Sequence, residues 1–270
     1  MLRTRVITGC ILGVLLLLGL FLLPPLGAVL AFGAVFTLGA WEWAGFGAMR
    51  NAAGRALYTL TIALLLLLGW RWSESPAHLM VLLGAACVWW LIAFCWLWLA
   101  PSRHHPVLVL ICGAAALVPA FVAITRLQVS TAGIARGPFV VLWLVLMVCA
   151  ADIGAYFAGR AFGRRKLAPR VSPGKTWEGA AGGLFLVMLI ALGGAVYLGL
   201  PALAVVPFGC AVGIFSIIGD LTESMFKRAA ALKDSGGLLP GHGGLLDRID
   251  SVTAAAPLYA LGLFGSGVIP

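Results

Sequence analysis

Residues that can hold a metal ion and phosphate groups gather in one stretch of the chain, residues 220–250. The whole sequence contains nine Asp and Glu residues, and five of them lie in these 31 positions. Asp220 and Glu223 are three residues apart, and so are Asp247 and Asp250, a spacing that places each pair on one face of a helix. Oxygen ligands of this kind suit a hard cation such as Mg²⁺. The pattern predicts one metal site shared by two helices, with Asp220 and Asp247 as the first ligands; the alternative is an ion-pair network that joins two helix ends to their loop.

The same stretch supplies cations and a flexible loop that suit phosphates. The segment G-G-L-L-P-G-H-G-G, which contains Gly243 and Gly244, lets backbone N–H groups approach a phosphate closely; a tight turn at the membrane is the alternative interpretation. His242 has no His or Cys at ligand spacing, so it fits a hydrogen-bond donor to phosphate better than a metal ligand. The other candidate groups for catalysis or substrate binding here are Ser224, Lys227, Arg228, Lys233, Asp234 and Arg248.

A second candidate segment runs from Asp152 to Glu178. Asp152 and Tyr156 are spaced i, i+4 near the end of an apolar run, where an acid is a candidate for function. The basic cluster that follows suits a membrane surface, or serves only as a topology anchor. The tail S-P-G-K-T ends like a P-loop, but Pro169 replaces the first glycine of that motif and no strand is expected before it. We interpret Ser172, Lys175 and Thr176 as a phosphate-binding turn at a helix N-terminus.

The composition is that of a membrane protein built from helices. Hydrophobic residues make up 62% of the 270, charged residues only 10%, and the mean hydropathy is +1.08. Apolar runs of about 20 residues are long enough to span a bilayer. The net charge of +9 indicates basic loops that lie beside anionic lipid, and not a nucleic-acid-binding protein. The six Cys lie in apolar runs and lack the spacing of metal ligands. We predict an all-α polytopic protein with nine spans, near 6–23, 27–48, 56–72, 78–99, 106–126, 138–159, 177–198, 203–226 and 251–267.

Lys and Arg predict the orientation of these spans. If the N-terminus is cytoplasmic and the first helix is uncleaved, fifteen of the eighteen basic residues fall in cytoplasmic segments. Both long polar loops, 160–176 and 227–250, then face the cytoplasm. Seven of the nine acids follow residue 150, so we expect residues 1–137 to form a scaffold of five helices and residues 138–270 a catalytic region of four. Glu42, in the second span, is left with two interpretations: a bond to a neighbouring helix, or the lining of a polar cavity.

Three motifs resemble one enzyme family. The pattern S-M-F-K-R-x4-K-D-S-G-x2-L-P-G-H-G-G-x2-D-R-I-D (224–250), the pattern A-D-x-G-A-Y-x-x-G-R-x-F-G (151–163) and S-P-G-K-T-W-E-G (172–179) are similar to the phosphatidate cytidylyltransferases, or CDP-diacylglycerol synthases. The resemblance covers essentially the whole chain. It implies that CTP and phosphatidate give CDP-diacylglycerol and pyrophosphate in the inner cell membrane. It also implies Mg²⁺, room for a second, monovalent cation such as K⁺, and a homodimer.

The residue pattern fits such chemistry and also allows rivals. Acids would hold Mg²⁺, and Lys227, Arg228 and Lys233 would neutralise phosphates, with the active site at the cytoplasmic ends of helices six to nine. A transporter would also carry acids in its spans, but there they would follow a path across the bilayer instead of clustering at one face. A CTP-dependent lipid kinase would transfer the γ-phosphate instead. A CDP-alcohol phosphotransferase is disfavoured because its D-G-x2-A-R motif is absent.

Overall fold

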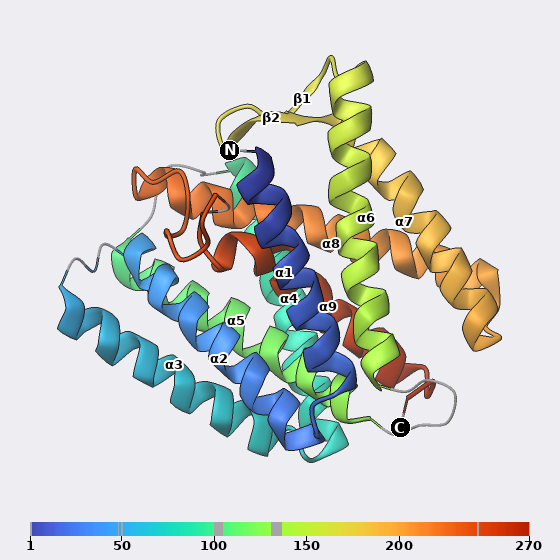
Figure 1. Ribbon diagram of the computed structural model, residues 1–270, viewed down its shortest axis with the longest axis horizontal. Helices are drawn as coiled ribbons and strands as arrows, with labels where there is room; N and C mark the ends of the chain where they lie inside the picture. Colours follow the sequence, from blue (N-terminus) through green and yellow to red (C-terminus); the bar gives the residue numbers. More distant parts are fainter. Residues whose placement is uncertain are drawn as a thin grey trace.

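Nine α-helices and one two-stranded sheet make up the part of the chain that the computed structural model describes, residues 2–47, 49, 51–99, 105–130, 137–241 and 243–269 (Figure 1). The helices fall within five residues of the predicted ranges at each end. Their bounds are α1 Leu2–Phe21, α2 Pro25–Phe46, α3 Ala52–Trp72, α4 Pro76–Leu99, α5 Pro106–Val129, α6 Gly137–Phe162, α7 Trp177–Leu198, α8 Ala202–Ala229 and α9 Leu246–Gly265.

Seven of these helices, α2 to α8, are long and apolar enough to cross a membrane, so the chain is a multi-pass membrane protein. The helix α1 contributes a shorter apolar segment, Ile7–Phe21. The helix α9 is not among the seven. Its first turns carry Asp247, Arg248 and Asp250, which lower its apolar content.

Local sequence sets several helix ends. The Asn51 side chain accepts a hydrogen bond from the Gly54 N–H at the start of α3, and Thr176 caps α7 in the same way through Gly179, at 3.1 Å. Gly199, at φ 65°, ends α7 in the left-handed conformation that glycine adopts without strain. The residues around Thr176 are therefore fixed relative to the first turn of α7.

The segment expected as an irregular loop, 160–176, contains an antiparallel hairpin. Strand β1 (Lys166–Ala168) pairs with β2 (Ser172–Thr176), with Lys166 opposite Thr176 and Ala168 opposite Ser172. The Glu178 carboxylate accepts hydrogen bonds from the Arg164 and Arg165 N–H groups at 3.1 and 3.2 Å, which ties the entry of the hairpin to α7. Two expectations were therefore wrong: S-P-G-K-T is a strand and not a turn, and a strand, β1, does precede this motif. Pairing between the two strands satisfies their backbone N–H groups, which the composition of this polar segment did not indicate.

Helices α6 and α7 pack closely because glycines line their contact. A Cβ on Gly154 would lie 2.5 Å from the Gly182 carbonyl oxygen, and one on Gly183 would lie 2.5 Å from the Ala151 carbonyl oxygen. Small residues allow such close backbone approach between helices in membranes. The contact holds the part of α6 that carries Asp152 against α7, which directly follows the hairpin.

Gly154→Val is expected to lower the free energy of unfolding by about 1–3 kcal/mol, because the added methyl groups push α6 and α7 apart. The matched control is Gly84→Val in α4, where a Cβ meets nothing within 4 Å. Thermal unfolding in detergent compares the two variants with the wild type. Equal midpoints for the Gly154 and Gly84 variants would contradict the close contact.

A second close crossing joins α8 to α9. A Cβ on Gly219 would lie 2.6 Å from the Asp250 carbonyl oxygen and 3.3 Å from Ser251 Cα. This approach brings the acid-bearing end of α8 against the start of α9. Figure 1 shows the hairpin, the loop between α8 and α9 and the N-terminus at the same end of the molecule.

Candidate active site

Each of the four acids predicted to share a site lies within electrostatic range of at least one of the others. Asp250 of α9 interacts with Asp220 of α8, and Glu223 of α8 interacts with both Asp250 and Asp247. The α8–α9 crossing produces this arrangement, since it places the end of one helix beside the start of the other. The structure thus brings together the two pairs that spacing alone had placed on separate helix faces.

Lys227 connects the two helices through these acids. Its Nζ lies 2.6 Å from Asp247 Oδ1 and 3.1 Å from Glu223 Oε1. The side chains of all three are almost entirely buried, with exposed fractions of 9% for Lys227 and Asp247 and 3% for Glu223. Breaking a buried pair leaves an uncompensated charge at a cost of about 3–5 kcal/mol. Lys227 therefore holds the acids in place in addition to its predicted role beside phosphate.

Asp247 organises the glycine-rich loop. Its Oδ2 accepts hydrogen bonds from the Ser235 N–H at 3.0 Å and the Gly244 N–H at 2.8 Å. Gly243 adopts φ 79°, and a Cβ there would lie 2.8 Å from Asp247 Oδ2, so glycine is required at this position. Asp247 precedes the predicted span 251–267. Burial raises its pKa, but the Lys227 ammonium and the two N–H groups outweigh burial and hold the pKa of Asp247 below its usual range.

Glu42, from α2, holds the same loop from the opposite side. Its Oε2 accepts from Ser235 Oγ at 2.9 Å and from the Leu246 N–H at 2.8 Å, while Oε1 accepts from the Leu245 N–H at 3.1 Å. The N-cap residue of α9, Leu245, offers no side-chain cap, so a carboxylate from a distant helix satisfies these donors. Of the two interpretations left open for Glu42, the bond to a neighbouring helix is correct, since Leu246 is the first residue of α9.

The neighbour of Glu42 fixes its position. Trp43 is buried, donates from Nε1 to the Val109 carbonyl at 2.8 Å and packs on Phe226 of α8 with ring centroids 5.5 Å apart. One tryptophan thus links α2, α5 and α8. The A-W-E-W motif therefore combines an anchor with a carboxylate aimed at the α8–α9 loop.

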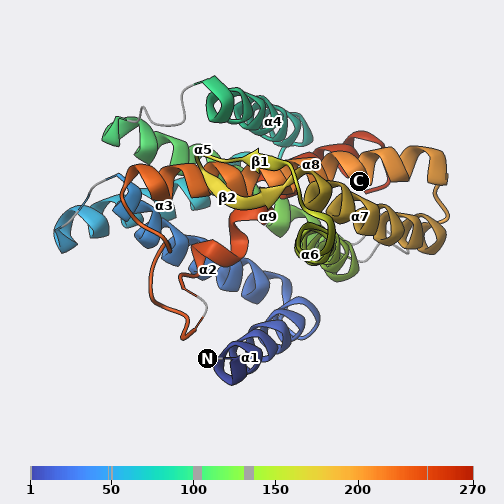
Figure 2. The same cartoon turned by 90° about the horizontal axis from the view of Figure 1, so that it is seen from above.

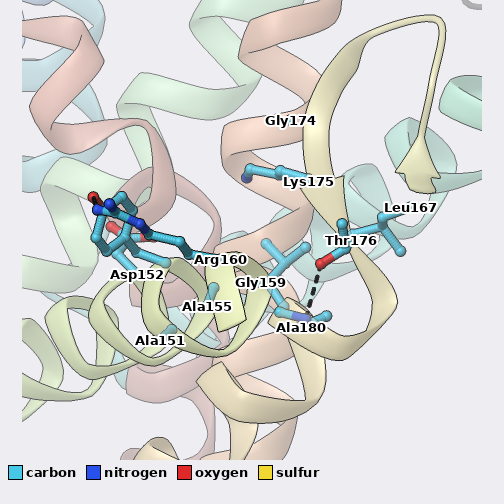
Figure 3. Close-up of a pocket in the computed structure, with 13 residues that line it drawn as sticks. Ala151, Asp152, Ala155, Gly159, Arg160, Leu167, Gly174, Lys175, Thr176 and Ala180 are labelled. Atoms are coloured by element: carbon cyan, nitrogen blue, oxygen red, sulfur yellow. Dashed lines mark hydrogen bonds between the residues drawn. The ribbon is translucent and has the colours of Figure 1, made fainter. Parts of the chain in front are cut away.

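A cavity of about 470 Å³ lies between α6, β2 and α7 (Figure 3). Lys175 extends from β2 toward the side of the cavity where α6 carries Asp152 and Arg160. The Lys175 ammonium forms an ion pair with Asp220, whose Oδ1 accepts from Ser224 Oγ at 3.3 Å. This cavity joins the S-P-G-K-T strand to the acids of α8. Among the predicted binding residues, Asp152, Tyr156, Lys175 and Thr176 line it.

The remaining described candidates do not line this cavity. Ser172 is half-buried in β2, Arg228 donates to the Leu232 carbonyl at 3.3 Å, and Lys233 is exposed. Asp234 is exposed, and a Cβ on Gly243 would meet its side chain at 3.3 Å. His242 lies outside the described residues.

The acids fit a hard cation by their chemistry. Both carboxylate oxygens of Glu223 are buried without a hydrogen-bond donor, although Lys227 lies at ion-pair distance from one of them. Among the described residues of the centre, five carboxylates (Asp152, Asp220, Glu223, Asp247 and Asp250) interact with three cations, Lys175, Lys227 and Arg248. In the described ranges no three His, Cys, Asp or Glu residues converge as a ready metal cage, and the ammonium groups of Lys175 and Lys227 lie against the acids. Excess negative charge and unbonded oxygens favour an added cation.

Sequence reasoning missed two contributors. Ser235 lies between Glu42 and Asp247, and its Oγ also accepts from the Asp247 N–H at 3.3 Å. Glu178 shapes the hairpin, although it appeared only as the end of a motif. The only sequence feature that could have indicated these roles is the motif that contains each residue, K-D-S-G for Ser235 and T-W-E-G for Glu178. Among the residues that the structure describes, neither of the two has a hydrogen-bond partner nearby in the sequence.

The fold and site define a multi-pass membrane protein with a charged, phosphate-suited centre at one end of its helices. The chain belongs to the cytidylyltransferase family, whose profile matches residues 3–264. It is 43% identical to a phosphatidate cytidylyltransferase of Pseudomonas aeruginosa, over 99% of this chain and 98% of that one. Proteins of the same name from Haemophilus influenzae and Brucella suis are 39% and 37% identical, over 96% and 98% of this chain and 98% and 93% of theirs.

Proposed function

We propose that this protein transfers the cytidylyl group of CTP to phosphatidate, giving CDP-diacylglycerol and pyrophosphate for phospholipid biosynthesis. The observation that carries the proposal is the ion pair of Lys175 with Asp220, which joins a cavity lined by a helix N-cap to the acids of α8 and α9. Full-length similarity to proteins named phosphatidate cytidylyltransferase supports the same reaction.

The reaction requires positioning and charge neutralisation more than proton transfer. A phosphate oxygen of phosphatidate attacks the α-phosphorus of CTP, a new P–O bond forms, and the bond from the α-phosphorus to the bridging oxygen breaks to release pyrophosphate. The lipid phosphate is already an anion, so it needs no strong base. Preorganised cations and N–H groups supply most of the rate enhancement in such transfers.

The positions of the side chains suggest a division of labour. Lys175, with Ser172 and Thr176 near the α7 N-terminus, binds phosphates on the cavity side. Lys227 and the loop N–H groups stabilise charge on the other side of the acids. Arg228, Lys233 and Arg248 neutralise phosphates entering from the open end, with Asp234 and Asp152 orienting them.

Mg²⁺ is the proposed cofactor. Asp220 and Asp247 would be its first ligands and Glu223 and Asp250 further ones, and the excess of carboxylates leaves room for a monovalent cation such as K⁺. A bound Mg²⁺ would supply Lewis-acid stabilisation of the negative charge on the phosphates and on the pyrophosphate leaving group. The lysines that contact these acids would then turn toward phosphate oxygens.

We place all nine helices across the inner cell membrane, with the N-terminus and the site on the cytoplasmic side. The positive-inside distribution supports this orientation, and Figure 1 agrees with it in placing the hairpin and the α8–α9 loop at one end. Residues 1–137 then act as a scaffold and 138–270 as the catalytic region. Glu42 crosses this division, since it joins α2 to the loop. The enzyme would work as a homodimer.

Purified protein in mixed micelles with phosphatidate, Mg²⁺ and labelled CTP is expected to form CDP-lipid and pyrophosphate in equal amounts. Chelation with EDTA should stop turnover, and added Mg²⁺ should restore it, because the acids otherwise repel the phosphates of CTP. CDP release with a phosphorylated lipid acceptor would indicate a kinase instead. Failure to consume CTP with any lipid phosphate would favour transport and contradict the proposal.

A further inference from the structure

A long apolar groove opens beside the candidate active site, between α1 and the body of the protein. It has a volume of about 720 Å³, in the range of roughly 300–1,000 Å³ that is usual for ligand pockets, and side chains of α1, α2, α5, α6 and α9 line it. Figure 2 shows α1 standing apart from the other helices. On α1 the lining runs from Leu12 to Gly19, which at 1.5 Å per residue is roughly 10 Å, a third of the hydrocarbon thickness of a bilayer, and Leu22 and Leu23 extend it just beyond the end of the helix.

One end of the groove is charged. Arg248 is the sole charged residue that lines it within the described ranges. Arg248 also interacts electrostatically with Asp152, which lines the cavity between α6, β2 and α7. The next residue, Ile249, faces the groove, whereas Asp247 and Asp250 belong to the acid cluster. Neighbouring positions of α9 thus serve the acids and the groove.

This distribution matches one kind of occupant. A molecule that fills the groove must be apolar along its length and anionic at the Arg248 end. Within the proposed reaction, phosphatidate has this form, with acyl chains below a phosphate. The charge at the end gives the groove a direction that an ordinary lipid-facing surface lacks.

We propose that the groove between α1 and the body seats one acyl chain of the lipid substrate, with its phosphate beside Arg248. This inference rests on the proposed function and extends it to how the lipid is held. Lipid tails surround the protein already, so seating a chain yields little hydrophobic energy. Its effect is orientation: the seated chain fixes the depth and direction of the phosphate relative to the acids, and small misplacements of reacting groups cost large factors in rate.

The test fills the groove from α1. A Cβ on Gly19, which lines the groove, meets nothing within 4 Å, and the same holds for Gly13 on the same helix, which does not line it. Gly19→Trp and Gly13→Trp are compared with wild type on dioleoyl and dihexanoyl phosphatidate. We expect the ratio of kcat/KM for dioleoyl over dihexanoyl substrate to fall about tenfold in Gly19→Trp and to stay at the wild-type value in Gly13→Trp. An unchanged ratio in both variants would overturn the proposal.

Two further measurements test the proposed acyl-chain seat independently of the α1 variants. Ala31→Trp fills the groove from α2 and should repeat the effect even if the α1 variant folds poorly. A phosphatidate with a diazirine at the end of one acyl chain, bound to the Asp247→Asn variant, should label residues 12–23 or 141–145; label confined to α3 or α4 would refute the seat. A wild-type protein that makes no CDP-lipid from either substrate would instead refute the proposed function, while the labelling still reports whether the groove holds the lipid.

Discussion

Asp247→Asn is expected to lower turnover of CTP and phosphatidate by about a thousandfold, equivalent to about 4 kcal/mol of transition-state stabilisation. Asp247 accepts hydrogen bonds from three donors, the Lys227 ammonium and the Ser235 and Gly244 N–H groups. An amide keeps the size of the side chain but loses the charge, and its NH₂ group faces a donor. The variant therefore loses a proposed ligand of Mg²⁺ and loosens the glycine-rich loop at once.

The protein should remain folded after this change, because Lys227 keeps Glu223 at 3.1 Å. Steady-state CDP-lipid formation and thermal unfolding in detergent measure the two effects separately. Glu74→Gln is the matched control: it removes one carboxylate from an exposed ion pair with Arg71, and its turnover should equal that of the wild type. Turnover within threefold of wild type in Asp247→Asn would remove Asp247 from the proposed metal site.

The helices were predictable because each is a long apolar run between breakers. Membrane spans satisfy their own backbone hydrogen bonds, so length and hydropathy indicate them directly. The i, i+3 spacing of Asp220 with Glu223 and of Asp247 with Asp250 also predicted which faces carry acid. The hairpin 166–176 was not predictable in the same way, since its strands are short and its entry is held by the Glu178 carboxylate, which lies in the first turn of α7.

Long-range pairing explains what the sequence left open at the site. Glu42 and Leu246 are 204 residues apart, and Lys175 and Asp220 are 45 apart. Spacing reports neighbours on one helix and says nothing about which helices cross. The crossing of α8 and α9 at Gly219, and of α6 and α7 at Gly154, decides which charges meet. The sequence indicated Lys175 as a phosphate-binding residue, but it did not indicate that this lysine forms an ion pair with Asp220.

Glu42→Ala is expected to reduce kcat about a hundredfold, although Glu42 touches no proposed substrate group. The change leaves three donors without a partner, the Ser235 hydroxyl and the Leu245 and Leu246 N–H groups, and each orphaned buried donor costs about 1–3 kcal/mol. The loop before α9 then moves, and Asp247 moves with it. Glu42→Gln retains the volume and one acceptor oxygen, so it should recover part of the activity.

A positioning role is separable from a general loss of stability by a double-mutant cycle. Ser235 Oγ lies between Glu42 Oε2 and the Asp247 N–H, so Glu42→Gln and Ser235→Ala should couple in kcat by about 1 kcal/mol. Thr61→Ala on α3, whose hydroxyl bonds only within its own helix, should add to Glu42→Gln without coupling. Hydrogen exchange should rise in 243–247 and stay unchanged in α6 and α7. If Ser235 and Thr61 behave alike in the cycle, Glu42 supports the fold in general; if only Ser235 couples, the scaffold positions the α8–α9 loop through one carboxylate.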